Sequence, residues 1–272
     1  MLGVIAAIAA LAPMLATTDP VEIDPAARNR RPGAERVVKS DDGTRTVSRY
    51  WMGTDTLGRD VYSRVVYGAQ ISLWVGFWVA FFSSGIGLAI GLVTGFSRPV
   101  DFIVMRFMDG LMSIPPVLLA IALMALTRAS TRNVILAITV SEIPRVTRLV
   151  RGVVLSLREQ PFVEAATAAG TGFFKTLWRH ILPNTLAPLL VQGTFICASA
   201  MITEAILSFI GAGTPPNIPS WGNIMAEGRS LFQVAYYIVL FPAVFLSVTV
   251  LAINLVGDGL RDALDPRLAR RM

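Results

Sequence analysis

The sequence predicts an all-α integral membrane protein with about six transmembrane helices. Of its 272 residues, 54% are hydrophobic and only 15% are charged, whereas a typical water-soluble domain has about a quarter charged residues. The apolar residues gather in long runs that polar, charge-rich stretches separate. Such runs indicate helices that cross a bilayer, because about 20 apolar residues span its hydrocarbon core.

The first two segments differ sharply in composition. Residues 1–16 are apolar and uncharged and are expected to form a first transmembrane helix, which is short for a span unless the start of the chain is missing. A signal-peptide core is the alternative, although no basic residues precede this segment. Residues 17–70 are polar and are predicted to form an extracytoplasmic loop. Its part 25–49 is expected to be exposed and its end, 60–70, to form a surface helix.

Five further spans are expected between residues 71 and 257, and a charged cytoplasmic tail is expected over 258–272. Arg and Lys are more frequent in the segments that this topology places inside the cell, apart from the long 17–70 loop. The five spans are expected at 71–96, 102–127, 134–150, 186–213 and 236–256.

Four residues within the spans are candidates for helix packing or for a transport path. Gly87, Gly91 and Gly95 lie four residues apart and give one helix face on which another helix can approach closely. The neighbour is either a helix of the same chain or one of a second subunit. Glu204 is a carboxylate inside a span, so it either lines a path or holds helices together by hydrogen bonds.

The polar segment 151–184 is expected to contain two short helices at the cytoplasmic surface. Alanines favour a helix that begins near Pro161, Gly170-Thr171-Gly172 breaks it, and a second helix over 173–181 is expected to stop at Pro183. A small-residue face with a single carboxylate suits docking into a groove of a partner protein. Lys175 and Arg179, one turn apart, face either an acidic patch of that partner or lipid head groups.

These residues carry a resemblance to a known family. Glu164-Ala165-Ala166, Gly170 and the run from His180 to Asn184 resemble the "EAA" loop of ABC importer permeases. The resemblance implies that this loop is a coupling helix that sits in a cleft of an ATPase subunit. His180 is then expected to form structural hydrogen bonds rather than to act as a proton relay. The implied ATPase-coupling residues are Glu164, Ala165, Ala166, Gly170, His180 and Pro183.

Three other stretches, 53–69, 204–222 and 254–266, are similar to the signatures of a narrower group. That group comprises the dipeptide, oligopeptide and nickel importer permeases of the second-subunit (DppC/OppC-like) type. Two features depart from it. No basic leader precedes the first apolar run, which puts the start residue in doubt, and Glu142-Ile143-Pro144 stands where relatives often carry a Trp.

The resemblance implies a subunit of an ATP-driven importer in the bacterial cytoplasmic membrane, forming half of the path for small peptides. Nickel, glutathione or other small solutes are the alternative substrates. Implied partners are a different permease subunit (DppB/OppB-like), two ABC ATPase subunits, an extracytoplasmic solute-binding protein and membrane lipid. An ion-coupled secondary transporter, with Glu204 and Arg145 as midplane charges, is the rival.

The sequence also indicates what the chain does not do. Neither Lys39 nor Lys175 follows a glycine, so no nucleotide-binding P-loop is present. We therefore expect no enzyme activity and no cofactor in this chain, with ATP and Mg²⁺ bound by the ATPase partners. The single cysteine, Cys197, and the single histidine give no metal-ligand spacing. The basic residues, nearly all arginine, lie beside apolar runs, which favours anionic lipid over nucleic acid.

Overall fold

The computed structural model describes residues 1–39 and 45–264, which fold into two compact units. The first unit contains Met1–Val75, Thr127–Val134 and Met201–Ala252, and the second contains Gly76–Leu126, Ile135–Ala200 and Ile253–Met272. The boundary between them falls within four long helices. These are α3 (Val61–Phe96), α6 (Thr131–Arg158), α9 (Leu182–Phe209) and α11 (Tyr237–Leu264).

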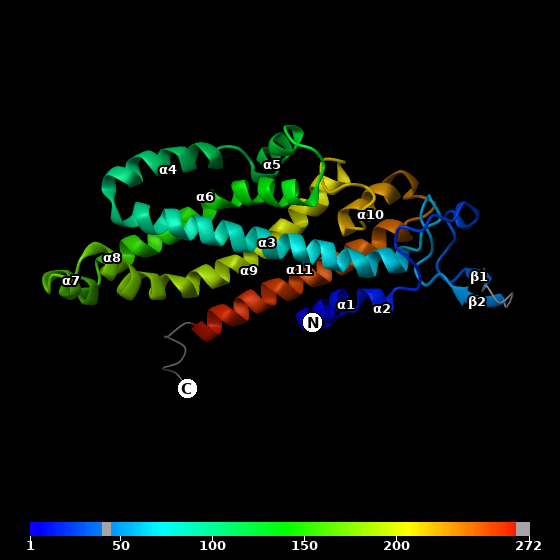
Figure 1. The fold of residues 1–272 in the computed structure, drawn as a ribbon, viewed down its shortest axis with the longest axis horizontal. Coiled ribbons are helices and arrows are strands. Elements are labelled where there is room, and N and C mark those ends of the chain that lie inside the picture. Colours follow the sequence, from blue (N-terminus) through cyan, green and yellow to red (C-terminus); the bar gives the residue numbers. More distant parts are fainter. Residues whose placement is uncertain (40–44, 265–272) are drawn as a thin grey trace. The chain divides into compact units, whose positions relative to one another are not determined.

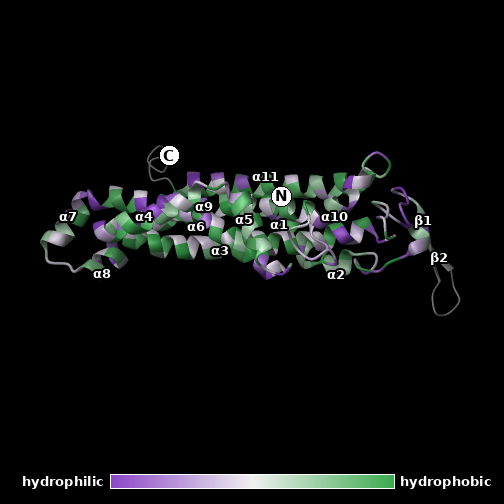
Figure 2. Cartoon of the chain, turned by 90° about the horizontal axis from the view of Figure 1, so that it is seen from above, coloured by the Kyte–Doolittle hydropathy of each residue, from purple (hydrophilic) through white to green (hydrophobic). Residues whose placement is uncertain are grey.

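Three helical segments of the described residues are long and apolar enough to cross a membrane. They are α3, a continuous 37-residue segment from Phe173 to Phe209, and α11. Helices α4 (Arg98–Met112) and α5 (Pro116–Ala125) would make a fourth as a pair, although they are bent by 87° at the break between them. The all-α membrane fold is therefore confirmed. Figure 2 shows hydrophobic residues along much of these helices and more hydrophilic ones in the loops near β1.

The predicted count of six spans is not confirmed. Residues 1–16 form α1 (Leu2–Ala10) and α2 (Ala12–Leu15), and each helix is shorter than a bilayer crossing. Helix α6 covers the predicted fourth span and has sufficient length, but Glu142, Arg145 and Arg148 interrupt its apolar character. The sixth predicted span extends as α11 to Leu264, so the first part of the predicted tail is helical. Residues 265–272 lie outside the described residues.

Residues 17–70 differ from the predicted loop in two places, at 60–70 and at 25–49. Residues 61–70 are the first turns of α3 rather than a separate surface helix. The Asp60 carboxylate accepts hydrogen bonds from the Ser63 backbone N–H at 3.0 Å and from its hydroxyl at 2.6 Å, which stabilises this helix start. The segment 25–49 contains η1 (Pro25–Ala27) and two antiparallel strands, β1 (Glu35–Lys39) and β2 (Arg45–Arg49), paired from Glu35↔Arg49 to Lys39↔Arg45 (Figure 1).

A buried charge cluster joins distant segments of the first unit. Asp55 is fully buried and accepts from Arg59 Nε at 2.7 Å and from Arg64 Nη1 at 2.8 Å. Glu227 of α10 (Trp221–Gly228) completes the cluster, 3.0 Å from Arg64 Nη1. The loop that carries Asp55 turns at Gly58, whose φ is +82° and whose Cβ, if it had one, would lie 1.7 Å from the Asp24 carbonyl oxygen. Only glycine fits this position.

In the second unit, α3 packs very closely against α6. A Cβ built on Gly87, Gly91 or Gly95 would lie 2.5, 2.6 or 2.6 Å from the Cβ of a valine of α6, and these valines are Val146, Val150 and Val154. Of the alternatives left open by the sequence, these distances favour packing within this chain. Helix α4 is held to α6 by two ion pairs, Asp101–Arg151 and Asp109–Arg148.

Candidate functional site

The candidate site is a helical hairpin of the second unit, formed by α7 (Pro161–Ala168), α8 (Phe173–Thr176) and η2 (Leu177–Ile181), hereafter the α7–η2 hairpin (Figure 1). Helix α7 begins with Pro161 in its first turn, where a missing N–H costs nothing. Glu164 lies in the same turn, where a carboxylate interacts favourably with the helix dipole. Three alanines and Thr167 form the rest of the helix, so local propensity favours it, although the N-cap residue Gln160 forms no side-chain capping hydrogen bond.

Gly170 ends α7 as the sequence predicts. Its φ is +80°, its N–H bonds to the Thr167 carbonyl at 2.9 Å, and the Thr171 N–H bonds to the Ala166 carbonyl at 3.0 Å. This pair of hydrogen bonds is the Schellman arrangement, in which a residue with positive φ turns the chain away from the helix axis. A Cβ at Gly170 would meet nothing within 4 Å, so the glycine is required by its backbone conformation and not by crowding.

The outer surface of α7 consists mostly of small side chains, apart from Phe162, which is 43% exposed. Only Val163 is buried, Ala166 is partly exposed, and Glu164, Ala165 and Ala168 are exposed. Within the described residues, Glu164 forms no ion pair. The four predicted residues Glu164, Ala165, Ala166 and Gly170 are thus brought together on a surface that a partner groove can reach.

The base of the hairpin contacts the end of α3, which is in turn bonded to the end of α6. The Phe173 ring stands edge-on to that of Phe96, the last residue of α3, with centroids 4.6 Å apart. Arg158, the last residue of α6, donates to the carbonyls of Gly95 at 3.0 Å and Phe96 at 3.4 Å, and its guanidinium lies 5.2 Å from the Phe96 ring. Sequence reasoning missed Arg158 because the predicted fourth span ended at residue 150, whereas α6 continues to Arg158.

The prediction that Pro183 stops the second helix is wrong. The chain passes through the π-helical turn η2 directly into α9, and the Leu182 N–H bonds to the carbonyl of Leu177, five residues back. Pro183 has no N–H and follows at once, in the first turn of α9, where none is needed. The proline therefore marks a change of helix type and not an end.

His180 lies in η2 and contacts α7. Its ring centroid is 6.4 Å from that of Phe162, and its carbonyl accepts from the Asn184 side-chain amide at 2.6 Å. The first contact links the two arms of the hairpin, and the second joins η2 to the first turn of α9. A structural role for His180 stays a prediction, and Pro183 is exposed beside it.

Glu204 belongs to a buried hydrogen-bond network of the first unit. Its Oε1 accepts from the Ser208 hydroxyl at 2.8 Å and from the Thr214 hydroxyl at 3.4 Å. Thr214 in turn lies 3.2 Å from the Ser220 hydroxyl and accepts from Asn223 Nδ2 at 2.9 Å. The network fastens the segment after α9 back onto that helix. Because Glu204 is fully buried, its contacts favour the packing hypothesis over lining a path.

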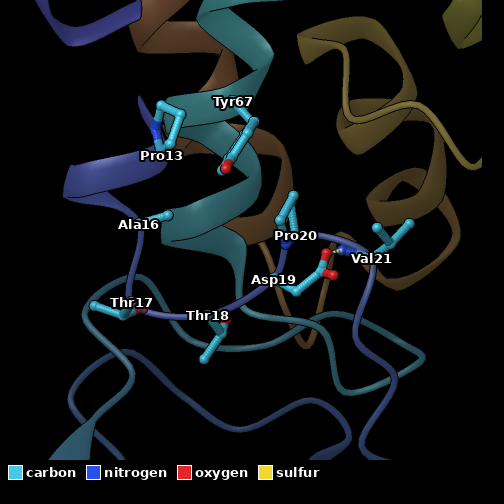
Figure 3. Close-up of a pocket in the computed structure, with 8 residues that line it drawn as sticks. All are labelled: Pro13, Ala16, Thr17, Thr18, Asp19, Pro20, Val21 and Tyr67. Atoms are coloured by element: carbon cyan, nitrogen blue, oxygen red, sulfur yellow. Dashed lines mark hydrogen bonds between the residues drawn. The ribbon is translucent and has the colours of Figure 1, made fainter. Parts of the chain in front are cut away.

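A cavity of about 490 Å³ opens in the first unit, between the segment after α2 and the side of α3 (Figure 3). Its polar groups already serve the fold. The Asp19 carboxylate accepts from the Val21 N–H at 2.9 Å, and the Thr17 hydroxyl donates to Asp60 at 2.7 Å. No group of three or more His, Cys, Asp or Glu side chains that could hold a metal occurs in the described part of the chain. The α7–η2 hairpin remains the better candidate.

Comparison with known proteins identifies related membrane components. Residues 85–270 match the family described as "binding-protein-dependent transport system inner membrane component". A probable peptide ABC transporter permease of Sinorhizobium fredii is 53% identical over 96% of this chain and 85% of its own length. The dipeptide transport system permease of Alkalihalophilus pseudofirmus is 39% identical over 96% of this chain and 82% of its own. A glutathione transport system permease of Escherichia coli is 43% identical, over 81% and 73% respectively.

Solved structures show the same fold. A chain of the methionine ABC transporter MetNI in an inward-facing conformation aligns with a TM-score of 0.62 and 23% identity, covering 74% of this chain and 96% of that one. A chain of an amino acid ABC transporter aligns with a TM-score of 0.56 and 16% identity, covering 76% and 95%.

Proposed function

Because this chain belongs to the family of binding-protein-dependent transport system inner membrane components, we propose that it forms half of the path by which an ATP-driven ABC importer takes up small peptides. It is a permease subunit of the bacterial inner membrane and not an enzyme, since the related proteins are transporter permeases. One structural observation carries the proposal. The α7–η2 hairpin presents an exposed surface and packs through Phe173 on the end of α3, where Arg158 bonds the end of α6 to the same residues of α3.

The geometry supports a mechanical role for this hairpin. A groove in an ATPase subunit can receive α7 because most of its outward side chains are small, with Glu164 as a hydrogen-bond acceptor and Phe162 as an apolar contact. Movement of the groove on ATP binding then displaces the hairpin. The Phe173–Phe96 contact and the Arg158 hydrogen bonds pass that displacement to α3 and α6. In this proposal Gly170 shapes the end of α7, while His180 and Pro183 maintain the return into α9.

The partners follow from the same proposal. A different permease subunit supplies the other half of the path, two ATPase subunits bind ATP and Mg²⁺, and an extracytoplasmic binding protein delivers the solute. The rival, an ion-coupled secondary transporter, leaves the hairpin without a purpose. Its support from Glu204 is also weaker, because this carboxylate is fully buried and its Oε1 is hydrogen-bonded to Ser208 and Thr214.

Peptides are the proposed substrate class because the relatives carry peptide, dipeptide and glutathione permease names. Glutathione is itself a tripeptide, so all three names refer to small peptides as substrates. Uptake of a labelled dipeptide and of glutathione by proteoliposomes that contain the whole importer would separate the two. Nickel or another small solute is the alternative, and it would be supported if neither peptide is taken up.

The coupling role is tested by Glu164→Gln and Glu164→Arg, with Glu159→Gln as the matched control. Both glutamates are exposed, but Glu159 precedes α7 and lies outside the proposed docking surface. We expect Glu164→Arg to reduce co-purification of the ATPase subunits and ATP-driven uptake at least tenfold, and Glu159→Gln to leave both unchanged. Uptake that survives Glu164→Arg, or that an ionophore abolishes while ATP is present, would contradict the proposal.

A further inference from the structure

The second arm of the hairpin differs chemically from α7. Its outward side chains alternate between large aromatic and cationic groups: Phe174 is 74% exposed and Trp178 is 68% exposed, and Lys175 and Arg179 are exposed beside them. Thr176, Leu177 and Ile181 are buried on the inner side. No acidic residue occurs between Phe173 and Ile181. This arm therefore has one packed side and one side that is both aromatic and basic.

Its position along the chain places this arm at the end of a membrane span. Residues Phe173–Phe209 form one continuous apolar segment of 37 residues. At 1.5 Å per residue it is roughly 55 Å long, whereas the hydrocarbon core is about 30 Å thick. The segment therefore extends beyond the core, and its first turns lie at the level where Trp side chains and Lys or Arg gather in membrane proteins.

We propose that Phe174, Lys175, Trp178 and Arg179 form a binding surface for anionic phospholipid head groups of the inner leaflet. The aromatic pair enters the boundary between head groups and acyl chains, and the two cations contact lipid phosphates. The α7 surface, with its alanines and Glu164, is unsuited to anionic lipid and is left for the ATPase subunit. The two arms thus contact different partners, and lipid fixes the height of the hairpin relative to the bilayer. The statement that lipid fixes the height of the hairpin rests on the proposed coupling function, whereas the lipid contact itself does not.

The lipid contact is tested with a fluorescent probe on the full chain in nanodiscs. Cys197→Ala removes the native thiol, and Trp178→Cys then carries a bimane label. Ala168→Cys, exposed on α7, is the matched control. Lipids with a nitroxide near the head group should quench the label at 178 several-fold more than the label at 168. Equal quenching at the two positions would overturn the proposal.

The role of the charges is tested in the importer assembled with its ATPase subunits. Nanodiscs contain phosphatidylcholine alone or with phosphatidylglycerol, and Arg132→Gln, an exposed arginine of α6, is the control. Each basic residue near an anionic surface strengthens binding about fivefold. Lys175→Gln with Arg179→Gln should therefore weaken phosphatidylglycerol binding by about 25-fold. Most of the effect of this lipid on transport-coupled ATP hydrolysis should then be lost, and the control should not change it.

Two outcomes of this second experiment contradict the proposal. The response to phosphatidylglycerol could persist unchanged in the double variant. Alternatively, the double variant could lose its ATPase subunits in phosphatidylcholine alone, which would assign the cations to an acidic patch of the ATPase. If no ATPase subunit accompanies even the unmodified chain, the proposed coupling function fails, and the quenching experiment still decides the lipid contact.

Discussion

Replacing a glycine of α3 with alanine should have opposite effects at two positions only a few residues apart. At Gly91, the new Cβ would lie 2.6 Å from Val150 Cβ and 2.9 Å from the Thr147 carbonyl oxygen. An ordinary carbon–carbon contact is about 3.6 Å, so α3 and α6 would have to separate by about 1 Å. At Gly85, a Cβ would meet nothing within 4 Å.

The expected free energies follow from these distances. Overpacking of this kind costs about 1–3 kcal/mol, and alanine recovers up to about 1 kcal/mol of helix propensity relative to glycine. Gly91→Ala should therefore destabilise the protein by about 1–2 kcal/mol, while Gly85→Ala should be neutral or slightly stabilising. For a chain of this size, 1 kcal/mol corresponds to about 2–4 °C in Tm. Thermal unfolding in detergent, followed by size-exclusion chromatography of the remaining folded protein, measures the difference.

A compensating change on α6 tests whether backbone proximity is the cause. At Gly87 the nearest atoms are Val146 Cβ at 2.5 Å and Cγ1 at 2.6 Å. Val146→Gly removes both atoms, whereas Val146→Ala keeps the Cβ in place. In double-mutant cycles, Val146→Gly should show a favourable coupling with Gly87→Ala of at least about 1 kcal/mol, and Val146→Ala a smaller one. Equal Tm values for Gly91→Ala and Gly85→Ala, or equal coupling for the two valine variants, would refute the reasoning.

Three further predictions concern single residues. Gly170→Ala should lower the free energy of unfolding by about 1–2 kcal/mol, because the φ of +80° at this position is unfavourable for alanine, and it should weaken ATPase co-purification. Gly170→Asn should have milder effects. Equal effects of the two variants would argue against the backbone explanation. Asp55→Asn should destabilise by about 3–5 kcal/mol, since it leaves two buried arginines, Arg59 and Arg64, with Glu227 as their single carboxylate partner. Glu227→Gln, at a site 21% exposed, should cost less in the same thermal assay, and the reverse order would contradict this. Arg158→Gln should lower the amount of solute transported per ATP hydrolysed several-fold, because the α3 carbonyls lose their hydrogen-bond donor. The exposed Arg98→Gln is the control and should leave this ratio unchanged. An unchanged ratio for Arg158→Gln would count against the mechanical link between α6 and α3.

The sequence predicted best what local signals determine. The start of α7 at Pro161 and its end at Gly170 both depend on residues within one turn, so the hairpin was found with nearly correct bounds. The periodicity of Gly87, Gly91 and Gly95 identified a packing face. It could not identify the neighbour, because the matching valines lie about 60 residues later and have no distinctive pattern of their own.

Features that depend on distant contacts were missed. Asp55 lies in a stretch that reads as a polar loop, yet Arg64 and Glu227 allow it to be buried. Strands β1 and β2 stabilise each other within a segment expected to be an exposed loop. Pro183 was misjudged because its usual effect on helices is cancelled by the π turn before it.

That π turn also sets how α8 is rotated about the helix axis relative to α9. Its hydrogen bond closes over five residues where an α-helix uses four, so one additional residue is accommodated between α8 and α9. One residue corresponds to about 100° of rotation around a helix axis. The direction in which the hairpin points is therefore encoded by a single surplus residue in the stretch 177–181. Insertion or deletion of one residue in this stretch would therefore rotate the hairpin relative to α9 without altering the length of either α7 or α9.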